Sequence, residues 1–175
     1  MSDLTHQTSL QKYAALFAGA IVNAGFGSLY AWSVFIIGLE TDLEIMRADV
    51  SVVFSLAIVS FTFGNFVSPY LFRHMSPAAL VFIAMAFGVS GLSIAAIGST
   101  YLTVIVGYGL LFGFGCGFAY NTVLQAGQAA MPDRPGLANG IIISAFAAGS
   151  VISAYLLSIG VAEMGVRATL WLLAM

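Results

Sequence analysis

The amino-acid sequence predicts an all-α, multi-pass membrane protein, and three observations carry that prediction. Of the 175 residues, 61% are hydrophobic and only 7% are charged, whereas about a quarter of a soluble domain is charged. The apolar residues form long runs, and a helix of roughly 20 such residues crosses the hydrocarbon core of a bilayer. The charged residues lie between these runs or at their ends. We therefore expect a lipid bilayer to surround nearly the whole chain.

The first apolar segment, 13–39, follows a polar tail formed by residues 1–12. It exceeds the apolar core of a signal peptide, which is about 7–15 residues long, so we expect it to stay in the protein. Four further segments of roughly bilayer-spanning length follow, separated by short polar or charged loops. They lie at 50–72, 78–97, 101–125 and 137–160.

A sixth apolar segment, 166–175, is about half the length that a membrane-spanning helix needs. The sequence therefore predicts a truncated sixth helix, or a last segment that lies on or in the membrane without spanning it. We expect residues 13–175 to form one transmembrane half-bundle.

The distribution of Lys and Arg predicts the orientation, because cytoplasmic loops are enriched in these residues. With the N-terminus inside, Lys12, Arg73 and Arg134 are cytoplasmic, whereas Arg47 and Arg167 are on the outer side. This three-to-two distribution favours a cytoplasmic N-terminal tail. The expected location is the plasma membrane, or the inner membrane of a bacterium.

Composition argues against several classes of function. A net charge of −2 with only five Lys and Arg residues does not predict a nucleic-acid-binding surface. The single cysteine, Cys116, permits no intrachain disulfide and is expected to be a buried packing residue. No predicted span contains two plausible metal ligands, so neither a metal nor another cofactor is predicted.

An enzyme is not predicted either. The run from Gly88 to Gly91 matches the G-x-S-G pattern around the serine of rhomboid-type intramembrane proteases. That chemistry needs a base within hydrogen-bond reach of the serine. The two histidines, His6 and His74, both lie outside the predicted spans.

The fourth span is unusually rich in glycine, with the sequence GYGLLFGFGCGFAYN at 107–121. A dinucleotide-binding loop would need a third glycine at Phe118, and a P-loop would need a lysine. Helical spacing explains the glycines better, because residues four apart share one helix face. That face contains Gly109, Gly113, Gly117, Asn121 and Gln125. It predicts close packing against another helix, as in small-xxx-small contacts.

Other spans have similar faces of small or polar residues. They contain Ser60, Gly64 and Ser68 in the second span, Gly140, Ser144 and Ala148 in the fifth, and Gly19, Asn23, Gly27 and Tyr30 in the first. Two interpretations remain open: plain helix packing, or packing in which part of each face lines a water-accessible path. Polar side chains in hydrocarbon need partners or water, so the amides either join helices or bind a solute.

Three stretches resemble the oxalate/formate antiporter family of the major facilitator superfamily. Residues 23–35 resemble that family's first helix, and residues 47–55 resemble the start of its second. Residues 113–120, followed by 132–140, resemble its fourth helix, the next cytoplasmic loop and the start of the fifth helix. The resemblance implies the six-helix N-terminal half of a major facilitator fold. It also implies secondary transport of a small solute, an organic anion such as a mono- or dicarboxylate, by alternating access.

The resemblance also implies roles for individual residues. The substrate-binding residues would be Asn23, Tyr30, Tyr120, Asn121 and Gln125. The helix-packing glycines would be Gly27, Gly64, Gly109, Gly113 and Gly117, and the gating loops would contain Arg73, Asp133 and Arg134. The expected partners are the bilayer, the solute, and a missing C-terminal half or a second copy of the chain.

Two departures from the family leave other interpretations open. The loop between the second and third helices, 69–78, lacks the acidic residue and the glycines of the usual family motif. The predicted spans also contain no Lys or Arg to pair with an anion. The alternatives are a truncated fragment that transports nothing, a six-span subunit that dimerises, and a membrane scaffold or accessory protein.

Overall fold

A computed structural model describes residues 9–175, with side chains from Lys12 onward. Within that range the chain is helical and contains no strand. Five helical rods in that range are long and apolar enough to cross a membrane. They are Lys12–Val34, Arg47–Phe72, Pro77–Ile97, Tyr101–Ala130 and Pro135–Ala174. The all-helical, multi-pass membrane architecture predicted from the sequence is confirmed. Residues 1–8, most of the predicted cytoplasmic tail, lie outside the described range.

The first apolar segment comprises three helices rather than one. Helix α1 (Ser9–Phe26) continues into the 3₁₀ helix η1 (Gly27–Val34), and α2 (Ile36–Leu43) follows. A 3₁₀ run of eight residues is long, since such runs seldom exceed 3–4 residues. Glu44 follows the last residue of α2, and its φ of 51° turns the chain toward the next rod.

Helices α3 (Arg47–Phe72) and α4 (Pro77–Ile97) begin at capped N-termini and match the predicted spans closely. The Met46 N–H donates to the Asp49 carboxylate at 3.2 Å. Before α4, the Ser76 hydroxyl accepts from a backbone N–H of the first turn at 3.3 Å, and Pro77 occupies the first helical position. These groups satisfy donors that a helix start would otherwise leave unpaired.

The fourth rod is continuous but changes its helix type along its length. It comprises α5 (Tyr101–Val104), the π-helix η2 (Ile105–Phe112) and α6 (Gly113–Ala130). The π-helix includes eight residues, whereas most π segments are single-turn bulges inside α-helices. The glycine-rich stretch therefore begins in wider helical geometry and ends in an ordinary α-helix.

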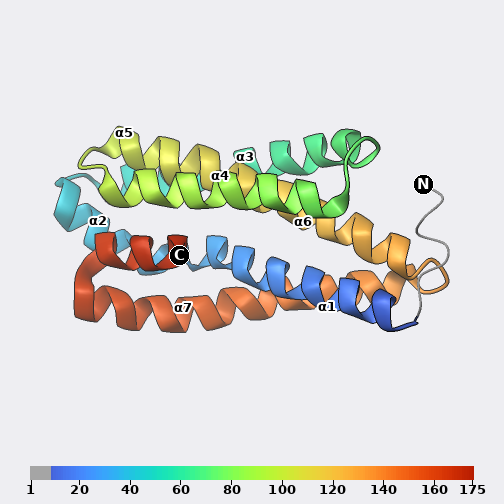
Figure 1. Ribbon diagram of the computed structural model, residues 1–175. Coiled ribbons are helices and arrows are strands. Elements are labelled where there is room, and N and C mark those ends of the chain that lie inside the picture. The colour runs from blue at the N-terminus through green and yellow to red at the C-terminus, as the bar shows by residue number, and fades with distance from the viewer. Residues whose placement is uncertain (1–8) are drawn as a thin grey trace.

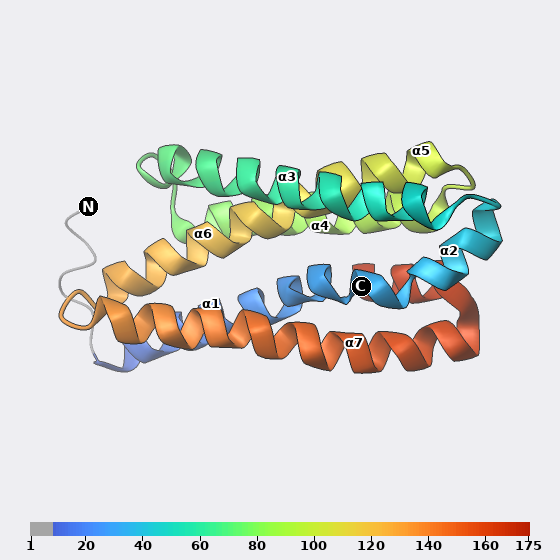
Figure 2. The same ribbon diagram turned by 180° about the vertical axis from the view of Figure 1, so that it is seen from behind.

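Helix α7 (Pro135–Ala174) doubles back on itself at Gly165. That residue has φ 81° and ψ 173°, a conformation that is essentially restricted to glycine. The last segment, 166–174, then runs back beside the bundle, so the C-terminus lies partway along its length (Figures 1 and 2). The loop expected between the fifth and sixth segments is reduced to this turn.

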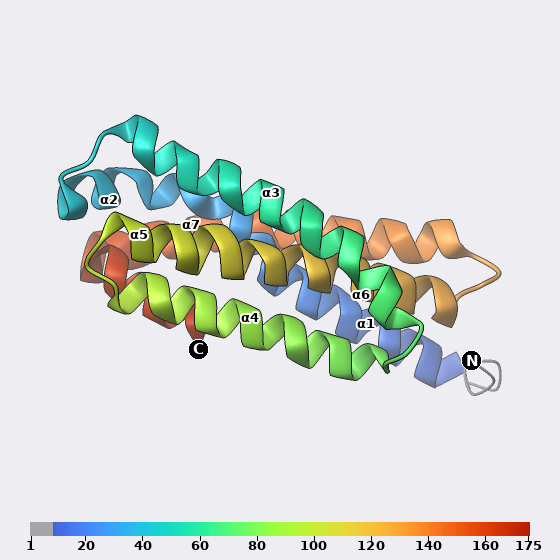
Figure 3. The same ribbon diagram turned by 90° about the horizontal axis from the view of Figure 1, so that it is seen from above.

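The rods lie side by side, with α3, α4 and α5 on one side of the bundle and α1, α2 and α7 on the other (Figures 1 and 2). Helix α6 runs between α3 and α4 when the bundle is seen from above (Figure 3). It contacts α1, α3, α4 and α7. In the most apolar stretch of the fourth rod 61% of the residues are buried, against 22–39% in the other rods. The fourth rod is therefore the central one.

Close helix crossings occur where glycines of α3 and α6 meet. A Cβ on Gly64 would collide with the backbone of α6 near Phe114, and a Cβ on Gly117 would collide with the Phe61 carbonyl. A Cβ on Gly113 would lie 2.6 Å from the carbonyl oxygen of Ala57. The two helices thus approach to a backbone separation that a larger side chain would prevent.

The same geometry recurs at two other crossings. Gly27 lies against the α7 backbone at Phe146 and Gly149, and Gly149 in turn lies against Ala24. Between α4 and η2, Gly91 and Gly107 face each other's carbonyl oxygens. Bilayer helices gain little from apolar burial against one another, so this close packing stabilises the bundle.

Candidate functional site

Five aromatic rings from four elements meet on one side of the bundle. This aromatic cluster consists of Tyr30 (η1), Phe54 and Phe61 (α3), Tyr120 (α6) and Phe146 (α7). Phe146 is its centre, with ring centroids 5.7 Å from Tyr30, 5.2 Å from Tyr120 and 6.2 Å from Phe61. The two Tyr–Phe146 contacts are edge-to-face, the arrangement that aromatic quadrupoles favour.

The central ring of the cluster is buried, whereas its two tyrosines are partly exposed. Phe146 is only 8% exposed, whereas Tyr30 is 51% exposed and Tyr120 is half-buried. The structure therefore brings together two predicted substrate-binding residues from opposite halves of the sequence. Among the described side chains, neither phenol hydroxyl has a hydrogen-bond partner, so both are available to a ligand that provides an acceptor or a donor.

A hollow adjoins the cluster and shares Tyr30 and Phe54 with it. The other lining residues are Trp32, Ser33, Ile36, Ser51 and Ser55. The hydroxyl of Ser51 donates to the Arg47 carbonyl at 2.9 Å, and that of Ser55 donates to the Ser51 carbonyl at 3.2 Å. The hollow is thus mildly polar and contains no charged side chain.

The predicted glycine face of the fourth rod lies against α3 along its length. After the glycine crossings along α6, the Asn121 amide donates to the Asn65 carbonyl at 3.2 Å. The Gln125 amide donates to the Asn121 side-chain oxygen at 2.7 Å. Ser68 and Thr122, both buried, join the helices at 2.9 Å. Asn121 therefore joins α6 to α3, whereas the 2.7 Å hydrogen bond of Gln125 stays within α6; both residues are half-exposed.

Asn23 lies in the contact between α1 and α7. It is fully buried, and its amide nitrogen donates to the Ile142 carbonyl at 2.9 Å. Its amide oxygen is buried without a hydrogen-bond partner. A side chain with no exposed surface cannot touch a solute in this conformation, so the structure gives Asn23 a packing position.

The predicted gating residues lie together at one end of the bundle. Arg73 follows the last residue of α3, and Asp133 and Arg134 lie between the end of α6 and the start of α7. Helices α3 and α6 finish at the same end of the bundle (Figure 1). All three are exposed. None of them forms an ion pair with another described residue.

The ion pairs of the described range lie at the opposite end. Arg47 pairs with Glu40 at 3.5 Å, and Arg167 lies 3.8 Å from the carboxylate of Asp42. Arg167 also donates to the carbonyl of Gly98. This arginine therefore joins the doubled-back segment to α2 and to the loop between α4 and α5, a role that no spacing in the sequence indicates.

Sequence reasoning missed the three phenylalanines of the aromatic cluster. The chain contains 14 Phe residues, and most bilayer-facing helices carry several, so residue type alone cannot separate a cluster member from a lipid contact. Phe61 lies three residues before Gly64 in the packing face of α3, which is a signal that could have found it. Phe54 and Phe146 have no such marker.

No group of three or more His, Cys, Asp or Glu residues in the described range could hold a metal ion. Cys116 is a free thiol and fully buried, as its apolar neighbours predict. No protein-family model matches the chain, and a search of the curated proteins finds no match.

Proposed function

We propose that this chain is the N-terminal half of a secondary carrier of the major facilitator type, and that it moves a small solute by alternating access. The three stretches that resemble the oxalate/formate antiporter family support the family. The observation that carries the function is the meeting of Tyr30 and Tyr120 around Phe146. Two partly exposed phenols on an aromatic base suit a solute-facing wall.

The aromatic cluster would contribute shape and hydrogen bonds to the site. Its rings offer an apolar wall, and the hydroxyls of Tyr30 and Tyr120 could donate to the oxygen atoms of a small carboxylate. The organic-anion class follows from the resemblance. The cluster itself has no cation, so the positive charge would come from a C-terminal half or from a second copy of the chain.

The glycine crossings would permit the motion. In carriers of this type two halves rock around a fixed site near the middle of the bilayer. Contacts such as Gly64 with Gly117, and Gly27 with Gly149, lie within this half and have no interlocking side chains, so its helices could shift slightly against one another as the two halves rock. The loops with Arg73, Asp133 and Arg134 would then form one gate.

A membrane scaffold or accessory protein is the second candidate, and one observation favours it. The polar end of the glycine face is occupied by hydrogen bonds within the bundle, since Asn121 donates to α3 and Gln125 donates to Asn121. A scaffold would need no water-accessible face at Tyr30 or Tyr120. The two candidates therefore differ in whether water reaches the aromatic cluster.

Cysteine accessibility in membranes separates them. In a Cys116→Ala background, Tyr30→Cys and Tyr120→Cys are treated with a membrane-impermeant thiol reagent. Val151→Cys is the control, because Val151 is 71% exposed on α7 and lies about 140° around that helix from Phe146. A carrier face predicts labelling at 30 and 120 and none at 151. If neither tyrosine position is labelled in folded protein, the carrier proposal fails.

A further inference from the structure

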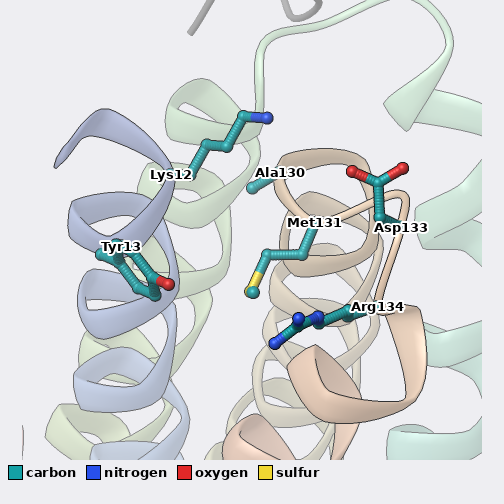
Figure 4. A pocket seen from close by; sticks show the side chains of 6 residues that line it. All are labelled: Lys12, Tyr13, Ala130, Met131, Asp133 and Arg134. Carbon is teal, nitrogen blue, oxygen red and sulfur yellow. The ribbon is translucent and has the colours of Figure 1, made fainter. Parts of the chain in front are cut away.

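A pocket lies at the end of the bundle where α1 begins, α6 ends and α7 begins. We call it the end pocket (Figure 4). It is lined by Lys12, Tyr13, Ala130, Met131, Asp133 and Arg134. The aromatic cluster does not require this hollow, and a gate that contains Asp133 and Arg134 does not explain the role of Lys12 and Tyr13 beside them, so the chemistry of the hollow needs a separate explanation.

Two cations border the end pocket from different elements. Lys12 projects from the first turns of α1, and Arg134 reaches from the loop before α7 toward the side where Tyr13 lies (Figure 4). Neither cation forms an ion pair among the described side chains. Asp133 also lines the pocket and offsets one of the two charges, so the pocket keeps a net positive charge.

An apolar seam joins α1, α6 and α7 next to the two cations. Leu16 lies one turn after Lys12, and Ala138 lies one turn after Arg134; both are buried. Gly127 of α6 faces both of them, since a Cβ there would lie 3.5 Å from Leu16 and 3.7 Å from Ala138. Packing thus sets how the segments that carry the two cations lie, and the exposed Arg134 side chain can turn toward a ligand.

The pocket also lies at a depth that suits a lipid headgroup. It is at the ends of apolar rods long enough to cross a bilayer, where phospholipid phosphates lie. Tyr13 is 61% exposed there, and tyrosine is typical of the membrane–water interface. Basic pockets between helices at this level bind acidic headgroups, and Arg and Lys are the side chains that bind phosphate most often.

We propose that the end pocket binds the phosphate group of an anionic phospholipid through Lys12 and Arg134. The Arg134 guanidinium would donate paired hydrogen bonds to two phosphate oxygens, and the Lys12 ammonium would add a third contact. The Tyr13 hydroxyl can donate to the glycerol side of the headgroup. Asp133 disfavours the anion, so its removal should tighten binding.

The test is a titration of the delipidated, detergent-purified chain with phosphatidylglycerol, followed by native mass spectrometry. Lys12→Gln and Arg134→Gln should each weaken the first binding event about fivefold, as expected for loss of one cation near a membrane surface. Asp133→Asn should strengthen it. Arg73→Gln is the matched control, because Arg73 is an exposed cation at the same end but outside the pocket.

Three results would overturn the proposal. The first is that phosphatidylcholine binds as tightly as phosphatidylglycerol. The second is that Arg73→Gln weakens binding as much as Arg134→Gln. Either result would mean that the end pocket has no special role in binding an anionic lipid. Displacement of the lipid by millimolar inorganic phosphate would instead assign the pocket to the free ion. Circular dichroism of each variant shows that a loss of binding is not a loss of fold. None of these readouts depends on transport.

Discussion

Gly165 has a backbone conformation that would cost another residue about 1–3 kcal/mol, and the doubled-back segment depends on it. Its φ of 81° and ψ of 173° lie in a region that is essentially restricted to glycine. The residues after it, Val166 and Leu170, are buried against the bundle. The turn therefore lets the last segment of α7 fold back and pack against the bundle.

Gly165→Ala should destabilise the chain by about 1–3 kcal/mol, because alanine is strained at this φ and ψ. The expected result is a lower midpoint in detergent thermal unfolding, together with greater proteolysis near residues 163–170. Gly140→Ala is the control, since Gly140 lies in regular helix with open space around its Cα. Alanine is a better helix former by about 1 kcal/mol. If both variants unfold alike, the turn carries no strain.

Asn23 and Tyr30 show how far single residues could be judged from sequence. Both lie on the small or polar face of the first span, and both were predicted to bind substrate. The structure buries Asn23 completely against Ile142 and leaves Tyr30 half-exposed. Sequence spacing gives the face of a helix but not the neighbour that covers it, so the two could not be separated beforehand.

At the scale of elements, the α3–α6 pair explains the glycine-rich stretch. A four-residue spacing places small groups of α6 opposite the α3 backbone, and the face ends in hydrogen bonds from Asn121 and between Ser68 and Thr122. The sequence predicted correctly that these residues share one helix face and pack closely against another helix. Its partner helix could not be predicted, because α1 and α7 also have faces of small or polar residues.

The Ser68–Thr122 contact gives a direct test of the α3–α6 pairing. The two hydroxyl oxygens lie 2.9 Å apart, so cysteines at both positions should form a disulfide readily. In a Cys116→Ala background, Ser68→Cys with Thr122→Cys should cross-link under mild oxidation, as seen by a shift on a non-reducing gel. Thr62→Cys with Thr122→Cys should not, because Thr62 lies on a different, exposed face of α3. Equal cross-linking of both pairs would contradict the pairing.

Helix boundaries were predictable where chemistry marks them. Ser76 with Pro77, and Thr100, are N-terminal signals that the structure uses as caps. The 3₁₀ helix at Gly27–Val34 and the π-helix at Ile105–Phe112 have no comparable sequence signal. They occur where glycines let a rod adjust its pitch to a close neighbour, which depends on tertiary packing.

At the scale of the whole molecule, charge and apolar surface divide cleanly. The ion pairs of Arg47 and Arg167 lie at one end, whereas Lys12, Arg73 and Arg134 lie at the other. Between the ends, large apolar side chains such as Phe17, Phe66, Phe82 and Tyr155 are exposed. This division is what a bilayer-spanning bundle requires, and the positions of the charged residues between the apolar runs of the sequence were enough to predict it.

The assembly of the aromatic cluster is a property of the whole fold. Its five rings come from four elements separated by up to 116 positions, from Tyr30 to Phe146, so no local pattern reveals it. The bundle brings Tyr30 and Tyr120 to the same buried ring, and this leaves two unpaired phenols at its surface. The carrier proposal depends on whether that surface receives a solute.

Solute protection of the cluster tests this central claim most directly. Tyr30→Cys and Tyr120→Cys in the Cys116→Ala background are labelled with and without a panel of small mono- and dicarboxylates, with exposed Arg73→Cys as the control. The account predicts that at least one carboxylate slows labelling at 30 and 120 in a saturable way and leaves the rate at 73 unchanged. Unchanged rates at both tyrosine positions with every carboxylate would contradict it.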